Sequence, residues 1–141
     1  MQFPYQKVPA TNNPKDPWFP LPLIKVRLSC NEKTIQVNAL IDSGASSSLF
    51  HSSIADALGI DLKTGIPKEF LGITGETVEA YFHLIGFQIV GMNSPIEIGV
   101  AFTESPGVGA LLGQTDFFQR YKVTFERYKE RIEISPTKTP K

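Results

Sequence analysis

Alternation of polar and apolar side chains constrains most of this chain to β structure. Residues 24, 26 and 28 are apolar whereas residues 25 and 27 are charged, a period of two that is typical of a half-buried strand. A turn at residues 31–33 separates this strand from a second one predicted over residues 34–41. Further strands are predicted over residues 68–73, 78–90, 96–103, 122–125 and 131–134. The sequence therefore predicts a mostly β fold.

Two short segments interrupt the strands with helical signals. Ser52 or Ser53 can cap a helix over residues 54–58, and Gly59 is placed to end it. Residues 114–120 form the second predicted helix. We therefore expect one or two short helices within the β fold.

Length and proline content predict one domain with an N-terminal extension. The chain has 141 residues, which fits a single domain. Six of its eleven prolines fall in the first 22 residues, where they oppose both a helix and a central strand. We expect an extended arm over residues 1–22, anchored to the surface by Trp18 and Phe19, a domain over residues 23–134 and a flexible tail over residues 135–141.

Charge and composition narrow the classes of partner. Fourteen Lys and Arg balance fourteen Asp and Glu, which argues against nucleic acid as the main partner. No apolar run is long enough for a membrane helix or a secretory signal, so no membrane association and a cytoplasmic location are expected. The single cysteine, Cys30, excludes an intrachain disulfide. His51 and His83 lie 32 positions apart without clustered ligands, so no metal site is expected.

The most informative residue for chemistry is Asp42. It directly follows the apolar run of residues 39–41 and precedes Ser43 and Gly44. An ionised carboxylate beside an apolar strand end costs several kcal/mol to desolvate unless it is paired or protonated. No other aspartate repeats this arrangement, so the partner carboxylate is expected from a second chain.

Three landmarks along the chain resemble those of retropepsin-type aspartic proteases. Residues 39–45 resemble the active-site signature, and residues 71–77, with Gly72 and Gly75, resemble the flap. Leu111, Leu112 and Gly113 resemble the apolar pair and glycine that brace the catalytic loop. Residues 113–134 are similar to the tail of retrotransposon-type and Ddi-type members, so the resemblance covers residues 23–134.

The resemblance implies a fold and an activity. The fold would be a closed, antiparallel, β-barrel-like lobe, and the activity that of an aspartic endopeptidase acting on a peptide or protein substrate. It would work as a homodimer, in which two Asp42 carboxylates share a proton and activate a water molecule without a metal or other cofactor. The catalytic residues implied are Asp42, Ser43 and Gly44, with the Ser43 hydroxyl bonded to the opposing loop.

The same resemblance assigns residues to substrate binding. The flap tip would close over an extended peptide, and the small apolar loop before Leu111 suits hydrophobic side chains. Ala45 stands where pepsin-like relatives carry a hydroxyl donor, and the loss of that donor predicts a mildly acidic to near-neutral pH optimum. The residues expected to contact substrate are Ala45, Ile73, Thr74, Gly75, Val108, Gly109 and Ala110.

Two departures from the retroviral pattern leave alternatives open. Ser46 and Gln114 are neutral where retroviral relatives usually carry an acidic and a basic residue, so an ion pair near the subunit boundary is missing. Dimer affinity is therefore an open question. A catalytically silent retropepsin-like module that binds peptides or dimerises is the alternative function, and a monomeric precursor awaiting release of its arm is a third.

Overall fold

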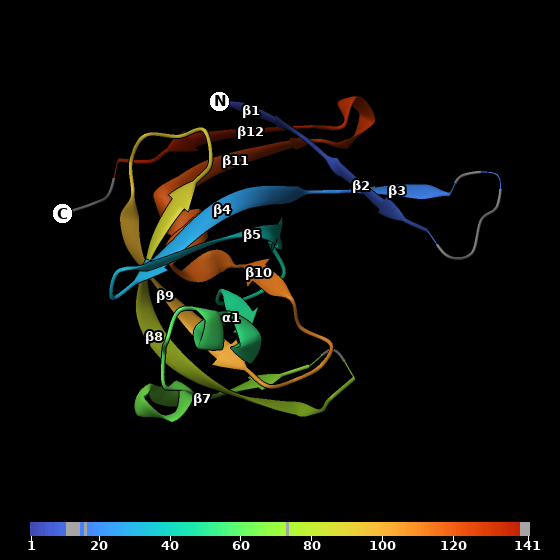
Figure 1. The fold of residues 1–141 in the computed structure, drawn as a ribbon. Coiled ribbons are helices and arrows are strands. Elements are labelled where there is room, and N and C mark those ends of the chain that lie inside the picture. Colours follow the sequence, from blue (N-terminus) through green and yellow to red (C-terminus); the bar gives the residue numbers. More distant parts are fainter. Residues whose placement is uncertain (11–14, 16, 73, 139–141) are drawn as a thin grey trace.

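A single large sheet that closes on itself forms the body of the molecule. The computed structural model describes residues 1–10, 15, 17–72 and 74–138. The sheet runs in the order β4 (Leu23–Cys30), β5 (Lys33–Ile41), β10 (Ala110–Leu112), β6 (Leu49–His51), β9 (Ile96–Thr103), β8 (Thr77–Ile89), β7 (Ile66–Leu71) (Figure 1). Because β4 also pairs with β8, all of these strands except β7 form a ring.

The predicted mostly β fold is confirmed, but two pairs of strands are parallel in a sheet that was expected to be antiparallel. Most neighbours in the ring are antiparallel, but β10 pairs in parallel with β5, and β6 pairs in parallel with β9. The ring is therefore closed without being wholly antiparallel. The two parallel pairs arise because β6 and β10 enter the sheet from loops rather than from hairpins with their neighbours.

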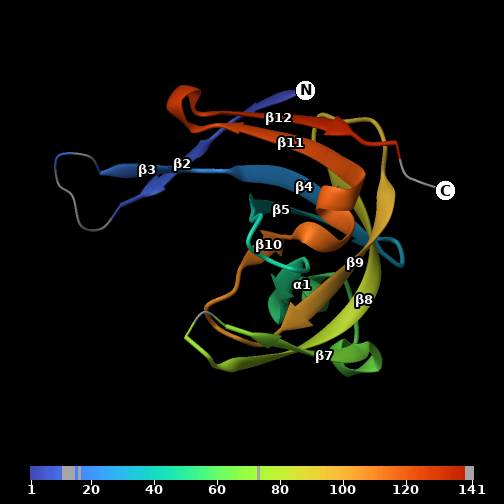
Figure 2. The same cartoon turned by 180° about the vertical axis from the view of Figure 1, so that it is seen from behind.

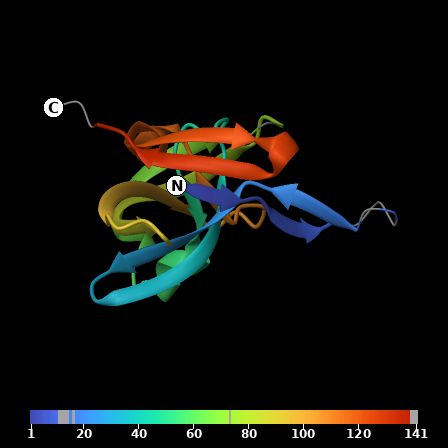
Figure 3. The ribbon, with the colours of Figure 1, turned by 90° about the horizontal axis from the view of Figure 1, so that it is seen from above.

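Two smaller sheets lie beside the ring. β1 (Gln2–Pro4) pairs with β12 (Arg131–Pro136), which pairs in turn with β11 (Tyr121–Glu126). The chain then forms an antiparallel hairpin of β2 (Gln6–Pro9) and β3 (Trp18–Leu21). Figure 2 and Figure 3 show this hairpin projecting away from the body, whereas β1 lies along the β11–β12 pair.

The residues predicted as an arm are extended where they are described, but only their first part lies on the domain, where β1 pairs with β12, whereas the β2–β3 hairpin projects from it. Edge strands tolerate proline, and β1 occupies an edge of its sheet. The expectation that Trp18 and Phe19 anchor the arm is wrong, because both lie on the projecting hairpin and are 52% and 50% exposed. At the other end, β12 continues to Pro136 and Thr137 donates to the Arg120 carbonyl, so residues 135–137 belong to the folded structure rather than to a flexible tail.

The alternation read from the sequence directs the apolar side chains into one core. Ile24, Val26 and Leu28 are buried, and the intervening Lys25 and Arg27 are exposed. Phe50 and Phe102 pack edge to face at 6.1 Å between ring centroids, which joins β6 to β9. Further along, Phe117 packs on Phe87 at 6.0 Å. The core thus runs through the ring and reaches the segment that follows β10.

The helix over residues 54–58 is found as α1 (Ser52–Ala57), which begins two residues earlier than predicted. Its cap is His51 instead of Ser52 or Ser53, because the Ser53 amide donates to His51 Nδ1 at 3.1 Å. The helix ends before Gly59, as predicted. Single turns of 3₁₀ helix follow at Leu62–Thr64 and Arg127–Lys129. No helix in the described part of the chain is long and apolar enough to cross a membrane.

The second predicted helix, over residues 114–120, is not a regular helix. The structure has a π-type turn at Gln114–Phe118 with non-helical angles inside it. Thr115 is extended, and Asp116 has a φ of 68°, a strained value for a residue other than glycine. Hydrogen bonds from Gly99 N to Asp116 Oδ2, at 2.5 Å, and from Asp116 N to Gln119 Oε1, at 2.8 Å, hold this conformation. Tertiary hydrogen bonds have overridden the local helical pattern here.

A buried ring residue is expected to carry far more stability than its exposed neighbour. Ile85 is 2% exposed and Leu84 is 58% exposed on the same strand, β8. We expect Ile85→Ala to lower the free energy of unfolding by about 3 kcal/mol, because it leaves a cavity in the core. Leu84→Ala should change it by less than about 0.5 kcal/mol. Urea denaturation followed by circular dichroism measures both, and equal losses would contradict this assignment of the core.

An ion pair closes the β11–β12 hairpin. Arg131 donates from Nε and Nη2 to Glu126 Oε1 at 3.1 and 2.6 Å, and Tyr128 donates to Glu126 Oε2 at 3.1 Å. The hydrogen bond from Arg131 lowers the pKa of Glu126 below its ordinary value of 4.5, with smaller help from Tyr128 and Lys129. The same bond raises the pKa of Arg131.

This pairing predicts an acid-dependent contribution to stability. Since the pKa of Glu126 is lower in the folded state, its stabilising effect is complete above the unfolded value of 4.5 and is lost as the pH falls through the folded value. We expect Glu126→Gln to lower the urea midpoint at pH 7, and we expect this difference from wild type to shrink progressively as the pH falls below 4.5. The exposed Glu97→Gln is the control, and its midpoint should follow wild type throughout the same pH range.

Candidate active site

The position of β10 between β5 and β6 creates the loop that carries Asp42. Leu111 and Leu112 pair with Leu40 and Ile41 on one side, and Leu111 also pairs with Leu49 on the other. Neighbouring strands lie about 4.8 Å apart, so the loop from β5 to β6 must cross about 10 Å over the end of β10. We refer to residues 42–48 as the Asp42 loop.

The chain that leaves β10 holds the Asp42 loop through its backbone. The Asp42 amide donates to the Leu112 carbonyl at 2.9 Å. The Gln114 amide donates to the Ala45 carbonyl at 2.8 Å, and the Thr115 amide donates to the Ser46 carbonyl at 3.0 Å. Residues 112–115, the bracing segment, therefore follow the loop along most of its length.

Side chains add a second set of bonds between the same two segments. The Gly113 amide donates to Ser48 Oγ at 3.2 Å, and Ser48 is fully buried. Thr115 Oγ1 donates to the Ser46 carbonyl at 2.9 Å. Gln114 Nε2 donates to the Ser43 carbonyl at 2.7 Å. Residues 46 and 114 were expected to lack an ion pair. In its place, Gln114 and Thr115 make neutral hydrogen bonds to backbone oxygens of the Asp42 loop.

Sequence analysis did not find these bracing side chains. It treated Gln114 only as the absence of a basic residue and assigned no role to Thr115 or Ser48. The available signal was that an amide and a hydroxyl side chain directly follow Gly113, in the segment already expected to brace the loop. Residue type alone does not show that their partners are main-chain carbonyls.

Asp42 lies at the end of β5 in a closed turn. Its side chain is half-buried, and the Gly44 amide donates to Asp42 Oδ1 at 2.9 Å. The Ala45 amide donates to the Asp42 carbonyl at 3.2 Å. Ser43 and Gly44 are exposed and Ala45 is half-buried. The carboxylate is therefore oriented by its own loop.

The predicted flap is a hairpin of β7 with the beginning of β8. Phe70 pairs with Val78, and Leu71 pairs with Thr77. At the tip, the Gly75 amide donates to the Gly72 carbonyl at 3.0 Å, and Gly75 has a φ of 88°, which favours glycine. Thr74 and Gly75 are exposed, and Ile73 lies outside the described residues.

The apolar loop before Leu111 is joined to the same sheet as the Asp42 loop. The His51 amide donates to the Gly109 carbonyl at 2.7 Å, and Ala110 pairs with Phe50. Val108 is half-buried and Gly109 is exposed, whereas Ala110 is buried. The structure thus brings Val108, Gly109 and the Asp42 loop to neighbouring strands, while Thr74 and Gly75 come from a separate hairpin.

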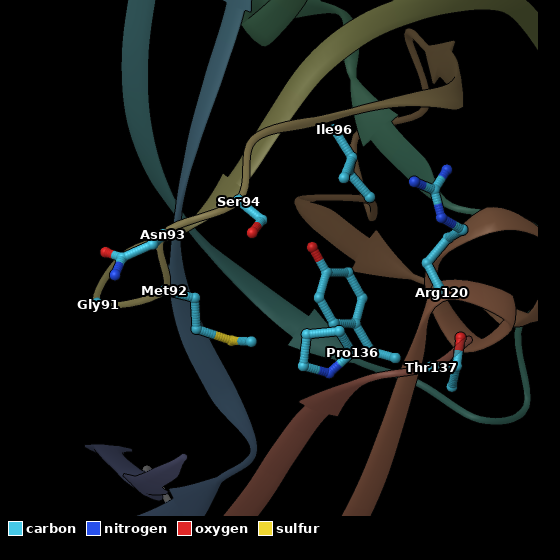
Figure 4. Close-up of a pocket in the computed structure, with 9 residues that line it drawn as sticks. Gly91, Met92, Asn93, Ser94, Ile96, Arg120, Pro136 and Thr137 are labelled. Carbon is cyan, nitrogen blue, oxygen red and sulfur yellow. The ribbon is translucent and has the colours of Figure 1, made fainter. Parts of the chain in front are cut away.

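A cavity at another part of the molecule contains none of the predicted site residues. It has a volume of about 250 Å³ and lies between the turn after β8 and the start of β11 (Figure 4). Tyr121 and Arg120 line it together with Pro136. Burial raises the pKa of Tyr121, an effect that Arg120 partly offsets. Within the described ranges, no cluster of three or more His, Cys, Asp or Glu side chains is arranged to hold a metal ion.

Comparison with known families identifies the domain. A family described as "Aspartyl protease" matches residues 25–115, which is more than half of the chain and includes the Asp42 loop and the bracing segment. The chain belongs to the aspartyl protease family. Its fold is also similar to the crystal structure of a retropepsin-like aspartic protease from Rickettsia conorii, with a TM-score of 0.59 and 16% sequence identity.

That match covers 92% of this chain and 98% of the Rickettsia chain, so the retropepsin-like fold extends over almost the whole molecule. No curated protein matches the chain. The resemblance predicted from the three landmarks is confirmed at the level of family and fold. In this aspartyl protease, the family match includes both the loop after β5 and the segment after β10.

The close approach of Gly113 to the Asp42 loop predicts a sharp effect of added volume. A Cβ at Gly113 would lie 2.5 Å from the Ser47 carbonyl oxygen and 2.7 Å from that of Ala45. Because both are backbone atoms, we expect Gly113→Ala to lower the free energy of unfolding by about 2 kcal/mol. Gly107→Ala, whose Cβ would meet nothing within 4 Å, should change it by less than about 0.5 kcal/mol in the same urea titration.

Proposed function

We propose that this aspartyl protease is an endopeptidase that acts as a homodimer, in which two copies of Asp42 activate a water molecule. The observation that carries the proposal is the fixed position of Asp42. A half-buried carboxylate, oriented by the Gly44 amide, ends β5 in a loop bonded to residues 112–115. Family membership supports peptide hydrolysis as the chemistry.

The requirement for two chains follows from the number of carboxylates. Acid–base hydrolysis of this kind needs one ionised and one protonated carboxyl group about 3 Å apart. Neither the Asp42 loop nor the bracing segment contains another acidic residue, and the Oδ2 of Asp116, which directly follows the bracing segment, accepts a hydrogen bond from the Gly99 amide. A second copy related by a two-fold axis would supply an identical Asp42 with the same local geometry.

The proposed reaction proceeds in two balanced steps. The ionised Asp42 takes a proton from water as the water oxygen bonds to the scissile carbonyl carbon, while the protonated Asp42 of the second copy gives its proton to the carbonyl oxygen. The tetrahedral diol then returns a proton to the second pair member, now ionised, as the carbonyl re-forms, and the first pair member, now protonated, is the proton donor for the next event. The leaving nitrogen takes up a proton from the pair as the carbon–nitrogen bond breaks, which yields a carboxyl group and an amine.

Substrate would bind as an extended peptide between the Asp42 loops and the β7–β8 hairpins. Thr74 and Gly75 at the hairpin tip can offer main-chain groups, and the exposed Leu71 beside them adds an apolar surface. Val108 and Gly109 would border the same cleft from the loop that leads into β10. Ala45 continues the loop after the carboxylate and supplies no hydroxyl donor to it.

Removal of the Asp42 charge tests the proposal. We expect the wild-type chain to cleave members of a random peptide library, and Asp42→Asn to lower cleavage by at least about a thousandfold, because an amide can act neither as the base nor as the acid. Asp61→Asn, at an exposed aspartate without a side-chain capping bond, is the matched control and should cleave like wild type. Products are identified by mass spectrometry.

Sedimentation velocity on the same samples separates the possible outcomes. If wild type sediments as a dimer and cleaves nothing, the proposed function fails and a module that binds peptides without hydrolysis takes its place. If cleavage persists in Asp42→Asn, another residue carries the chemistry. Activity that rises with the square of protein concentration in the dilute range would support the two-chain site.

A further inference from the structure

One peptide unit lies between Gln114 and Asp42. The Ser43 carbonyl and the Gly44 amide belong to the same peptide group, which is planar and trans. Gln114 Nε2 donates to the oxygen of this peptide group at 2.7 Å. The N–H of the same peptide group, that of Gly44, donates to Asp42 Oδ1 at 2.9 Å. The two bonds leave the peptide group in opposite directions, because carbonyl and N–H are antiparallel across it.

We infer that Gln114 is a positioning residue that aims the Gly44 N–H at the Asp42 carboxylate by holding the Ser43 carbonyl. This inference rests on the proposed function for its catalytic consequence, but the geometry itself concerns only the single chain. A rotation of the peptide plane would break both bonds together. The side chain of a residue 71 positions away from Ser43 thus controls a hydrogen bond to the residue proposed to activate water.

Other bonds to the loop leave this peptide plane free to rotate. The backbone bonds of the bracing segment reach the carbonyls of Ala45 and Ser46, and the Ala45 amide reaches the Asp42 carbonyl. Thr115 Oγ1 also reaches the Ser46 carbonyl. Ser43 and Gly44 are exposed, so neighbouring side chains do not clamp the plane by packing. Among the bonds described for this loop, the Gln114 amide is the one that holds the Ser43 oxygen.

The surroundings make a neutral donor suitable at this position. Residues 42–48 and 110–116 contain two charged residues, Asp42 and Asp116. The Asp116 carboxylate accepts a hydrogen bond from the Gly99 amide on β9. The parallel partner β5 carries its one charged residue, Lys33, at the far end from Asp42. A glutamine amide is not ionised at any working pH, so its bond to Ser43 persists while the carboxyl pair titrates.

A donor aimed at a carboxylate stabilises the ionised form, and its loss favours the protonated form. Gln114→Met keeps a similar side-chain length and removes the donor. We therefore expect the acidic limb of the kcat/KM profile to move to higher pH by about half a pH unit, which corresponds to the loss of one modest hydrogen bond. The measurement is cleavage of a library-derived peptide from pH 3 to pH 8.

Gln114→Glu gives a conditional version of the same test. Its ionised carboxylate cannot donate and repels the Ser43 oxygen, whereas its protonated form can donate. We expect its activity relative to wild type to fall where the introduced carboxylate is ionised while the Asp42 pair titrates, and to recover at lower pH, where the introduced group is protonated and can donate. A residue with a merely structural role would lower activity by a constant factor across the profile.

Thr115→Val is the matched control within the bracing segment. It removes one side-chain hydrogen bond to a loop carbonyl, that of Ser46, which is not part of the peptide group bearing the Gly44 amide. We expect it to lower the urea midpoint as Gln114→Met does and to leave the acidic limb at the wild-type pH. Equal displacement in both variants would overturn the inference and assign the effect to general loosening of the loop.

A second measurement keeps the inference testable if the chain does not cleave peptides. In ¹⁵N-labelled protein, the Gly44 amide resonance should shift with pH as the carboxyl group that it contacts titrates. We expect the midpoint of that shift to rise in Gln114→Met and to match wild type in Thr115→Val. An unchanged midpoint in Gln114→Met would overturn the inference, while an inactive wild type with a displaced midpoint would overturn only the proposed function.

Discussion

The insertion of β10 between β5 and β6 is the constraint on which the site depends. A loop between two adjacent antiparallel strands could close in a tight turn, but here the loop must pass over a third strand that pairs with both neighbours. The carbonyls and amides at the end of β10 therefore meet the loop at close range. Buried backbone polar groups need partners, and each segment supplies them to the other. Asp42 is held because the topology leaves its loop few other conformations.

The sequence predicted the long elements of the ring well, and the reason is periodicity. β9 matches its predicted bounds and β8 differs by one residue at each end, since strands of eight and thirteen residues are long enough for a β-type sequence pattern to show. β6 and β10 have three residues each, too few for a period to show. The strands before Leu23 were missed because their prolines argue against central strands and say nothing about edges or hairpins.

For the site, residue identity located the chemistry, whereas tertiary contacts determined how it is held. Asp42, Ser43 and Gly44, which the sequence indicated as candidate catalytic residues, form a turn directly after the apolar end of β5. The bracing bonds of Gln114 and Thr115 join segments about half the chain apart, and no local pattern indicates which carbonyl an amide side chain will reach. The hydrogen bonds that Thr115 and Asp116 make outside a helical pattern explain why residues 114–120 do not form the predicted regular helix.

The parallel pairing of β5 with β10 also determines when, during synthesis and folding, the Asp42 loop gains its support. Ser43 and Gln114 are 71 positions apart, so the loop that bears the acidic group is synthesised long before the strand that secures it. Bringing together residues so far apart in the chain costs more conformational entropy than forming the β4–β5 hairpin, and it is therefore slower. A nascent chain that ends before residue 110 contains every atom of Asp42 but lacks the support that orients it. The hydrogen bonds that orient Asp42 therefore form late, once the residues from Ala110 onward have joined the fold.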